Sequence, residues 1–166
     1  MPAVVLVHPQ IPPNTGNIAR TCAATQTPLH LIEPLGFELS DRYLKRAGLD
    51  YWPYVTLYCH PDWPTFLKTT HSGGRLVAFE PSAQQIYWDF SFAESDWLVF
   101  GSEPDGIPAD VLATCDAFLK IPMWQPAVRS LNLSASVAIA LMEAYRQLHY
   151  STNPSLAQSK IHLTSQ

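Results

Sequence analysis

Short apolar segments recur along most of the chain, and each is apolar nearly throughout instead of alternating with polar positions. Uniformly apolar segments of this length are typical of strands that are covered on both faces of a sheet. The predicted strands are 3–7, 29–33, 54–59, 75–80, 97–101 and 117–122.

Segments with helical periodicity separate these strands. The last one is the clearest, because Leu133, Val137, Leu141 and Leu148 fall on one apolar stripe of a helix. Strands that alternate with helices predict a parallel sheet with helices on both sides, so the predicted fold class is α/β. The predicted helices are about 15–26, 40–47, 62–70, 108–115 and 132–149.

Length and composition indicate one compact domain. The chain has 166 residues, of which 47 % are hydrophobic and 14 % are charged. This is enough apolar material for one sizeable core, which we assign to residues 1–150. The polar segment 151–166 has no periodic pattern and is predicted to be a disordered or loosely docked tail.

Charge and residue usage narrow the possible partners and the compartment. The net charge of −4 gives no overall basic field, so a nucleic acid would have to be held by a local patch or by a second copy of the chain. The three cysteines form no CxxC pair and the six histidines show no ligand spacing, so we expect reduced thiols and no metal. No apolar stretch approaches the roughly 20 residues of a membrane helix, and we expect a soluble, cytoplasmic protein that has no membrane contact.

Three loops at the ends of predicted strands carry the candidate chemistry. They are IPPNTGNIAR (11–20), FGSEPDGIP (100–108) and the segment 121–138. In open α/β sheets, ligands bind at the edge where the strands end. Neither the dinucleotide pattern GxGxxG nor the phosphate-loop pattern GxxxxGK[ST] is present, so a site here must use another geometry.

In the first loop, Asn14 or Thr15 is the predicted N-cap of the helix that follows. Gly16 and Arg20 are i and i+4 neighbours on one face of that helix, so the arginine lies beside a position without a side chain. Two interpretations of Arg20 remain open at this point. It is either a solvated helix arginine or a guanidinium that binds a phosphate or a ribose oxygen.

The other two loops also have two interpretations each. Gly101 and Gly106 allow a flat ligand such as adenine to approach the backbone, although a plain strand-to-helix connection also uses glycine. Arg129 and Ser130 precede a helix N-terminus, where free N–H groups favour anions. Equally, Ser130 or Asn132 is a plain cap of that helix.

The segment 41–52 concentrates basic residues in an otherwise acidic chain. Arg42, Lys45 and Arg46 are interleaved with tyrosine and tryptophan. Such interleaving suits RNA, whose phosphates bind the cations and whose bases stack on the rings. The alternative is a solvated amphipathic helix.

Five segments taken in order resemble the SPOUT class of RNA methyltransferases. They are 14–20, 29–37, 44–52, 100–108 and 120–138, and the resemblance covers about residues 1–150. The chain is most similar to the short members of this class, which methylate the ribose 2′-oxygen of the wobble nucleotide of tRNA.

The resemblance implies a parallel-sheet SPOUT fold with a C-terminal trefoil knot and a cleft for S-adenosylmethionine. It also implies a homodimer, with the first motif and the last helix at the interface, so that one site uses two chains. By motif, the catalytic residues would be Arg20 and Glu103. The residues that contact the cofactor would be Phe79, Gly101, Ile121, Ser130 and Leu131. Those that contact the RNA would be Asn14, Arg42, Lys45, Arg46, Arg129 and Asn132.

The implied reaction is an in-line attack of the ribose 2′-oxygen on the methyl group of the cofactor. A guanidinium stays protonated at any ordinary pH, so Arg20 is expected to bind the ribose or phosphate and to stabilise the developing alkoxide instead of acting as a base. Two alternatives are a 2′-O-methyltransferase for another RNA, such as ribosomal RNA, and a non-catalytic module that binds RNA or the cofactor.

Overall fold

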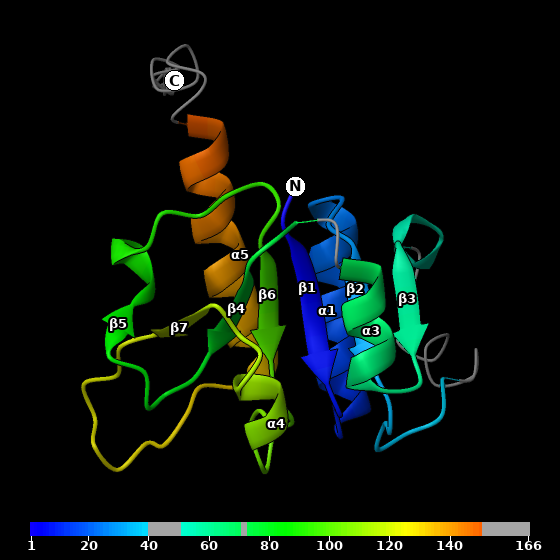
Figure 1. The fold of residues 1–166 in the computed structure, drawn as a ribbon, viewed down its shortest axis with the longest axis horizontal. Helices are drawn as coiled ribbons and strands as arrows, with labels where there is room; N and C mark the ends of the chain where they lie inside the picture. Colours follow the sequence, from blue (N-terminus) through cyan, green and yellow to red (C-terminus); the bar gives the residue numbers. More distant parts are fainter. Residues whose placement is uncertain (40–50, 71–72, 151–166) are drawn as a thin grey trace, which may run out of the picture.

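A seven-stranded sheet in which all strand pairs are parallel runs through the protein (Figure 1). The computed structural model describes residues 1–39, 51–70 and 73–150. The strand order is β3-β2-β1-β6-β4-β7-β5. The strands are β1 (Ala3–Val7), β2 (Leu29–Ile32), β3 (Leu57–His60), β4 (Leu76–Phe79), β5 (Gln85–Ile86), β6 (Trp97–Phe100) and β7 (Ala117–Lys120).

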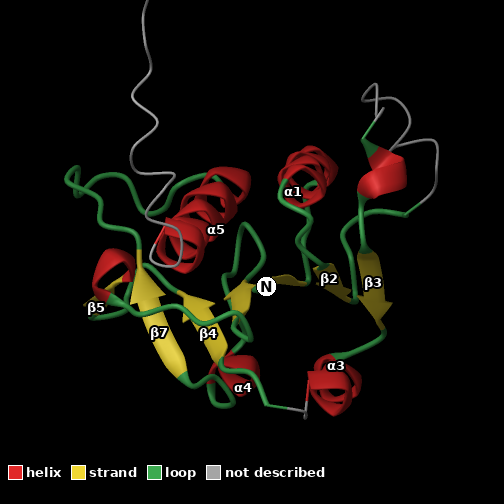
Figure 2. Cartoon of the chain, turned by 90° about the horizontal axis from the view of Figure 1, so that it is seen from above, coloured by secondary structure: helices red, strands yellow, loops and turns green. Residues whose placement is uncertain are grey.

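Helices cover both faces of the sheet, as Figure 2 shows. On one face lie α1 (Pro12–Ala24) and α5 (Leu133–Tyr150), and on the other lie α3 (Trp63–Thr70) and α4 (Ala109–Leu112). Every residue of β1, β2 and β4 is buried. The α/β fold class is therefore confirmed, because the uniformly apolar segments are the strands with a helix layer on each side.

Successive residues of β1 point into two separate cores. Val4 and Leu6 belong to the core beneath α1 and α5, whereas Val5 and Val7 pack in the core that contains Phe66 of α3. This alternation follows from the two-residue period of a strand, so both faces of β1 must be apolar. No helix of the described residues has both the length and the apolar character needed to cross a bilayer.

The first helix begins earlier than predicted, and the predicted cap is wrong. The N-cap position is Ile11, which makes no side-chain cap bond, and Asn14 and Thr15 are buried inside the helix. Pro12 and Pro13 occupy the first turn, where a missing N–H costs least and the fixed φ of proline favours helix. The helix therefore starts at the prolines without needing a polar cap of its own.

Other differences concern short elements. The third strand starts at Leu57 because Trp52–Tyr54 form a 3-10 turn, η1. The two-residue strand β5 and the 3-10 turn η2 (Tyr87–Asp89) were not predicted. The helix α4 is shorter than the predicted 108–115. The predicted helix at 40–47 and the predicted tail 151–166 lie outside the described residues.

The sheet contains a point where the chain order reverses. From β1 the chain continues to β2 and β3 on one side, whereas β6, β4 and β7 lie on the other side. The loop after β1 leads to α1 on one face of the sheet, and the loop after β6 leads to α4 on the other face. A crevice at such a point is the usual ligand site of an open α/β sheet.

Two buried histidines lie side by side in β2 and at the end of β3. His30 Nδ1 is 2.9 Å from His60 Nε2, and the rings are stacked. Phe66 and Trp97 pack edge-on against the His30 ring. Burial and repulsion from His60 lower the pKa of His30 from 6.5 to about 4, and burial also lowers the pKa of His60. The pair is neutral in the folded protein at neutral pH.

We predict that acid destabilises the protein through His30. As the pH drops from 6.5 to 4, the unfolded chain binds a proton that folded His30 does not, and the free energy of unfolding should fall by about 3 kcal/mol. Urea unfolding across this pH range measures the loss. His30→Asn should remove this share of the pH dependence, whereas His149→Asn, on an exposed part of α5, should retain it. An unchanged slope in His30→Asn would contradict the assignment.

Candidate active site

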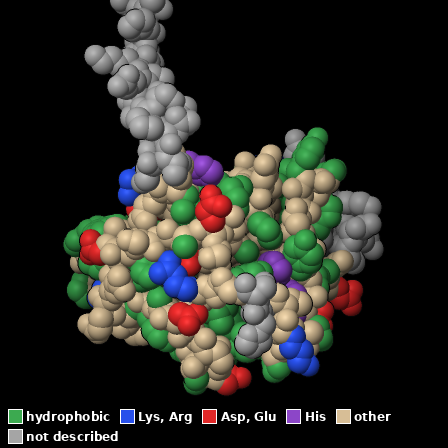
Figure 3. Space-filling view, turned by 45° about the horizontal axis from the view of Figure 1, so that its top comes forward, with side chains coloured by type: hydrophobic (Ala, Val, Ile, Leu, Met, Phe, Trp, Pro, Cys, Tyr) green, Lys and Arg blue, Asp and Glu red, His purple; other side chains and the backbone are tan. Residues whose placement is uncertain are grey.

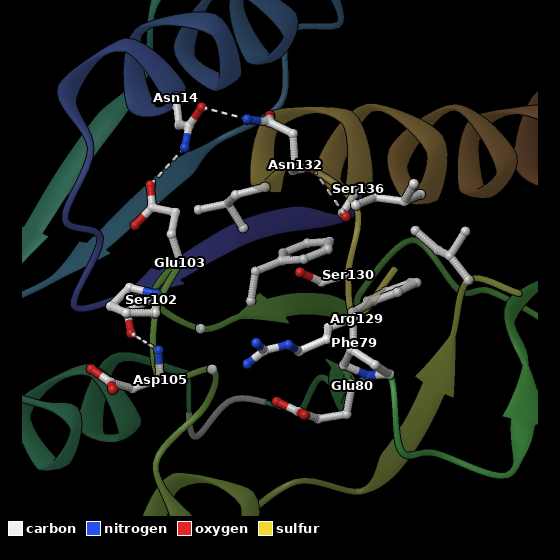
Figure 4. A pocket seen from close by; sticks show the side chains of 18 of the residues that line it. Asn14, Phe79, Glu80, Ser102, Glu103, Asp105, Arg129, Ser130, Asn132 and Ser136 are labelled. Atoms are coloured by element: carbon white, nitrogen blue, oxygen red, sulfur yellow. Dashed lines mark hydrogen bonds between the residues drawn. The ribbon is translucent and has the colours of Figure 1, made fainter. Parts of the chain in front are cut away.

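A cavity of about 560 Å³ opens at the carboxyl ends of β4, β6 and β7. The start of α1 and the segment leading into α5 complete its walls (Figure 4). The volume lies in the range of about 300–1,000 Å³ that is usual for small-molecule sites. The predicted site residues that line it are Asn14, Phe79, Gly101, Glu103, Ile121, Arg129, Ser130, Leu131 and Asn132.

One wall of the cavity is flat and apolar. The rings of Phe79 and Phe100 lie 4.9 Å apart and nearly parallel, and both residues are buried at strand ends. Leu119, Ile121 and Leu131 extend this wall. Such a surface suits a planar, weakly polar group such as a purine ring.

The loop after β6 folds tightly back on itself. Ser102 and Gly106 exchange two backbone hydrogen bonds of 3.0 Å, and Gly106 has a φ of +72°. A Cβ on Gly101 would lie 1.9 Å from the carbonyl carbon of Gly106. Glycine is therefore required at position 101 by direct backbone contact, and the loop brings bare backbone to the cavity wall.

Charged side chains also line the cavity. Glu80, Glu103 and Asp105 are acidic, and Arg129 is the basic lining residue among those described. Figure 4 shows Glu80 and Arg129 projecting into the same part of the cavity. The formal charge of these lining side chains is negative, which favours a ligand with a positive group.

Glu80 also lines the cavity and was not predicted as a site residue, although its position at the end of a predicted strand was a signal for it. This residue directly follows Phe79, the last residue of β4. Its Oε1 accepts a hydrogen bond from the Ile107 N–H at 3.2 Å, which ties the end of β4 to the loop after β6. A carboxylate at the carboxyl end of a buried parallel strand is a candidate for ligand contact by position alone.

The Glu103 carboxylate anchors the start of α1. Its Oε2 accepts from the Gln10 N–H at 2.8 Å, and its Oε1 accepts from Asn14 Nδ2 at 2.9 Å and from the Ile11 N–H at 3.3 Å. The carboxylate also lies at the positive end of the helix dipole. Its observed contacts are thus structural, and its catalytic role stays a prediction.

Asn132 caps α5 and joins it to α1. Its Oδ1 accepts from the Ser134 N–H at 2.9 Å, and its Nδ2 donates to Asn14 Oδ1 at 2.9 Å. The cap interpretation of Asn132 is therefore correct. Asn14, in turn, links Asn132 to Glu103, so one run of hydrogen bonds joins three of the cavity loops.

Arg20 is not part of this cavity. It lies six residues beyond Asn14 on α1, which is about 9 Å along the helix axis. Its guanidinium carbon lies 5.0 Å from the centroid of the Tyr51 ring, and the Tyr51 hydroxyl donates to the Gly16 carbonyl at 2.9 Å. Gly16 had indicated an open face beside Arg20. The structure shows that Tyr51 covers this face instead. The predicted RNA-binding residues Arg42, Lys45 and Arg46 lie outside the described residues.

A parallel α/β sheet with a ligand-sized cavity at its carboxyl edge defines a ligand-binding α/β domain. Comparison with protein-family models narrows this class. The model of the SpoU rRNA Methylase family matches residues 1–142, and the chain belongs to this family. The predicted methyltransferase family is confirmed.

Two relatives are similar over nearly their whole length. A Synechocystis sp. protein with the provisional name tRNA (cytidine(34)-2′-O)-methyltransferase is 57 % identical over 151 residues, which are 89 % of this chain and 97 % of that protein. The tRNA (cytidine(34)-2′-O)-methyltransferase of Burkholderia ambifaria is 48 % identical over 147 residues, which are 87 % of this chain and 94 % of that enzyme.

Solved structures agree with this fold. A structure described as giving insights into the 2-OH methylation of C/U34 on tRNA matches with a TM-score of 0.84 and 51 % identity, covering 89 % of this chain and 96 % of that one. An AdoMet-bound rRNA methyltransferase from Sinorhizobium meliloti matches with a TM-score of 0.79 and 25 % identity, covering 89 % and 56 %. The predicted knot stays a prediction. Within residues 1–39, 51–70 and 73–150, no group of three or more His, Cys, Asp or Glu is placed to hold a metal ion.

We predict that Glu103→Gln destabilises the protein by about 1–3 kcal/mol, because an amide cannot accept from all three N–H donors that the carboxylate now satisfies. Urea unfolding measures this loss. Glu94→Gln is the matched control, since the Glu94 side chain is 71 % exposed, and it should change stability by less than about 0.5 kcal/mol. Equal stability of both variants would show that Glu103 does not anchor α1.

Proposed function

We propose that the protein uses S-adenosylmethionine to methylate the ribose 2′-oxygen of the wobble nucleotide of tRNA, a cytidine or a uridine at position 34. The observation that carries this proposal is that residues of all three loops, 11–20, 100–108 and 121–138, line one cavity. The chain is also 48 % and 57 % identical to proteins with this name. The predicted activity agrees with these relatives. Residues 1–150 form the single catalytic domain in this proposal, and the protein works in the cytoplasm with its tRNA substrate.

The cavity fits S-adenosylmethionine in three respects. Its apolar wall at Phe79 suits the adenine, and its negative lining suits a sulfonium cation. Gly101 and Gly106, which have no side chains, let a ligand approach the backbone at the cavity wall. Phe79, Gly101, Ile121, Ser130 and Leu131 would hold this cofactor, which supplies a methyl group already activated on sulfur.

The protein then has to orient the ribose and manage its charge. Correct alignment of two reactants contributes about 7–11 kcal/mol in favourable cases. Arg20 would bind the ribose or a neighbouring phosphate and stabilise the negative charge that grows on the 2′-oxygen. It would not accept the proton, because a guanidinium has a pKa above about 12 and remains charged.

A homodimer would bring Arg20 to a cavity. Within one chain Arg20 lies about two turns of α1 away from the cavity residue Asn14. The helices α1 and α5 lie side by side on one face of the sheet (Figure 2), and Met142 of α5 is 55 % exposed. A two-fold interface on this face would place Arg20 of each chain at the cavity of the other.

Contacts with RNA would come from few residues. On the face shown in Figure 3, basic side chains of the described residues are scattered singly among other types. Arg129 at the cavity, Arg20 and the basic residues Arg42, Lys45 and Arg46 are the proposed phosphate contacts, with Asn14 and Asn132 beside the bound nucleotide. Doubling these contacts in a dimer offsets the acidic net charge of the chain.

We predict that the purified protein transfers labelled methyl groups to total tRNA, and that nucleoside mapping places the label on the 2′-oxygen of nucleotide 34. Gly101→Ala should abolish transfer and weaken S-adenosylmethionine binding more than about tenfold, because the added Cβ cannot fit against Gly106. Gly16→Ala is the matched control for calorimetric binding, since its Cβ would meet nothing closer than 4.0 Å. Label in ribosomal RNA alone would favour the other substrate, and cofactor binding without transfer to any RNA would favour a non-catalytic module.

We predict that a hybrid dimer rescues two inactive variants. One chain carries Arg20→Ala and the other carries Gly101→Ala, with different affinity tags to isolate the mixed dimer. If the site uses two chains, one of the two cavities regains both an intact cofactor site and Arg20, and activity returns to about half of wild type. An inactive hybrid would show that Arg20 serves the cavity of its own chain.

A further inference from the structure

Tyr51 lies outside the cavity, yet it contacts α1 at two points. Its ring lies under the Arg20 guanidinium, with 5.0 Å from the guanidinium carbon to the ring centroid. Its hydroxyl donates to the Gly16 carbonyl oxygen at 2.9 Å. Tyr51 is half-buried and directly precedes η1, which packs beside α1.

The two contacts are one helical turn apart. In an α-helix the carbonyl of residue 16 also accepts the backbone N–H of residue 20, so the Tyr51 hydroxyl binds the same turn that carries Arg20. The ring is therefore fixed relative to the base of the arginine side chain, and its face supports the far end. Tyr51 is thus bound to the helical turn that carries Arg20 and also contacts the guanidinium at the end of that side chain.

Gly16 makes room for this arrangement. A Cβ at position 16 would have the Tyr51 hydroxyl oxygen as its nearest neighbour, at 4.0 Å. A methyl group would therefore be tolerated, whereas a longer side chain would displace the phenol from the helix. The small residue one turn before Arg20 thus leaves room for the Tyr51 hydroxyl beside α1.

An arginine has many rotamers in solution, and a planar guanidinium stacks well on an aromatic face. Contact with the Tyr51 ring removes many of these rotamers before substrate arrives. Preorganised donors of this kind contribute more to a transition state than mobile ones.

We infer that Tyr51 is a positioning residue for the methyl transfer, which holds the Arg20 guanidinium in the orientation that the ribose or its phosphate requires. This role rests on the function proposed above. Tyr51 acts through Arg20 and makes no contact with the cavity. The ring carries most of the effect, and the hydroxyl fixes the place of the ring on α1.

The test compares Tyr51→Leu, Tyr51→Phe and the control Tyr54→Leu, which changes a tyrosine that is 73 % exposed in the neighbouring turn. Tyr51→Leu should lower kcat for tRNA methylation about tenfold and leave the affinity for S-adenosylmethionine unchanged. Tyr51→Phe should keep activity within about threefold of wild type, since the ring remains. Thermal unfolding of each variant is measured alongside, and an active Tyr51→Leu enzyme would overturn the inference.

A double-mutant cycle separates positioning from general structural damage. In an Arg20→Lys background no guanidinium plane is left to stack, so Tyr51→Leu should cost much less than it does in wild type. If the fold-losses of activity in Tyr51→Leu and Arg20→Lys instead multiply in the double variant, Tyr51 does not act through Arg20, and the inference fails.

A spectroscopic measurement keeps the test independent of the activity. The Nε–H signal of Arg20, assigned by its loss in Arg20→Lys, should be shifted by the ring current of Tyr51 in wild type and Tyr51→Phe, and should move in Tyr51→Leu. An unmoved signal would overturn the inference even in an active enzyme. Absence of tRNA methylation by wild type would instead overturn the proposed function, and the Nε–H comparison would still decide whether Tyr51 orders Arg20.

Discussion

The carboxylate of Glu103 holds together the parts of the chain from which the cavity is built. The N–H groups of Gln10 and Ile11 lie just before the prolines that begin α1, and both donate to a carboxylate outside the helix. This carboxylate belongs to Glu103 in the loop after β6, more than ninety positions away in the sequence. Asn14 and Asn132 extend the connection to the cap of α5. Removing one member would therefore loosen three loops at once, because each polar group in this run is the partner of the next.

The sheet explains why these loops meet at all. The strands β1 and β6 are hydrogen-bonded neighbours, so the segment after β1 and the segment after β6 leave the same edge side by side. The strands are buried on both faces and cannot slide without exposing apolar side chains. The positions of the loop ends are thus set by core packing, whereas the polar network sets only how they close over the cavity. The glycine contact between Gly101 and Gly106 keeps that closure tight.

How much of this could be predicted from the sequence depends on the range of the contact. Six of the seven strands follow from apolar segments. The pattern is strongest in β1, β2 and β4, because burial on both faces makes every position apolar or nearly so. The strand β5 is only two residues long and leaves no such pattern. The cap of α1 was predicted wrongly because Pro12 and Pro13 occupy the first turn, and the Asn14 side chain instead donates to Glu103, far along the chain. Asn14, Gly101, Arg129, Ser130 and Asn132 were singled out from loops at predicted strand ends, whereas the other predicted residues around the cavity were named only from family resemblance. The contacts of Tyr51 with α1 and of Glu80 with Ile107 were not predicted, because they join segments that are distant in the sequence.

The position of Arg20 also follows from electrostatics. S-adenosylmethionine carries a sulfonium cation, and the cavity lining, with Glu80, Glu103 and Asp105 against Arg129, is formally negative. A lining of this sign attracts the cofactor but repels the phosphates of RNA. A further arginine inside the same cavity would improve the binding of RNA phosphates but weaken the binding of the sulfonium cation. Holding Arg20 on the outer face of α1, stacked on Tyr51, keeps its charge away from the cofactor within one chain.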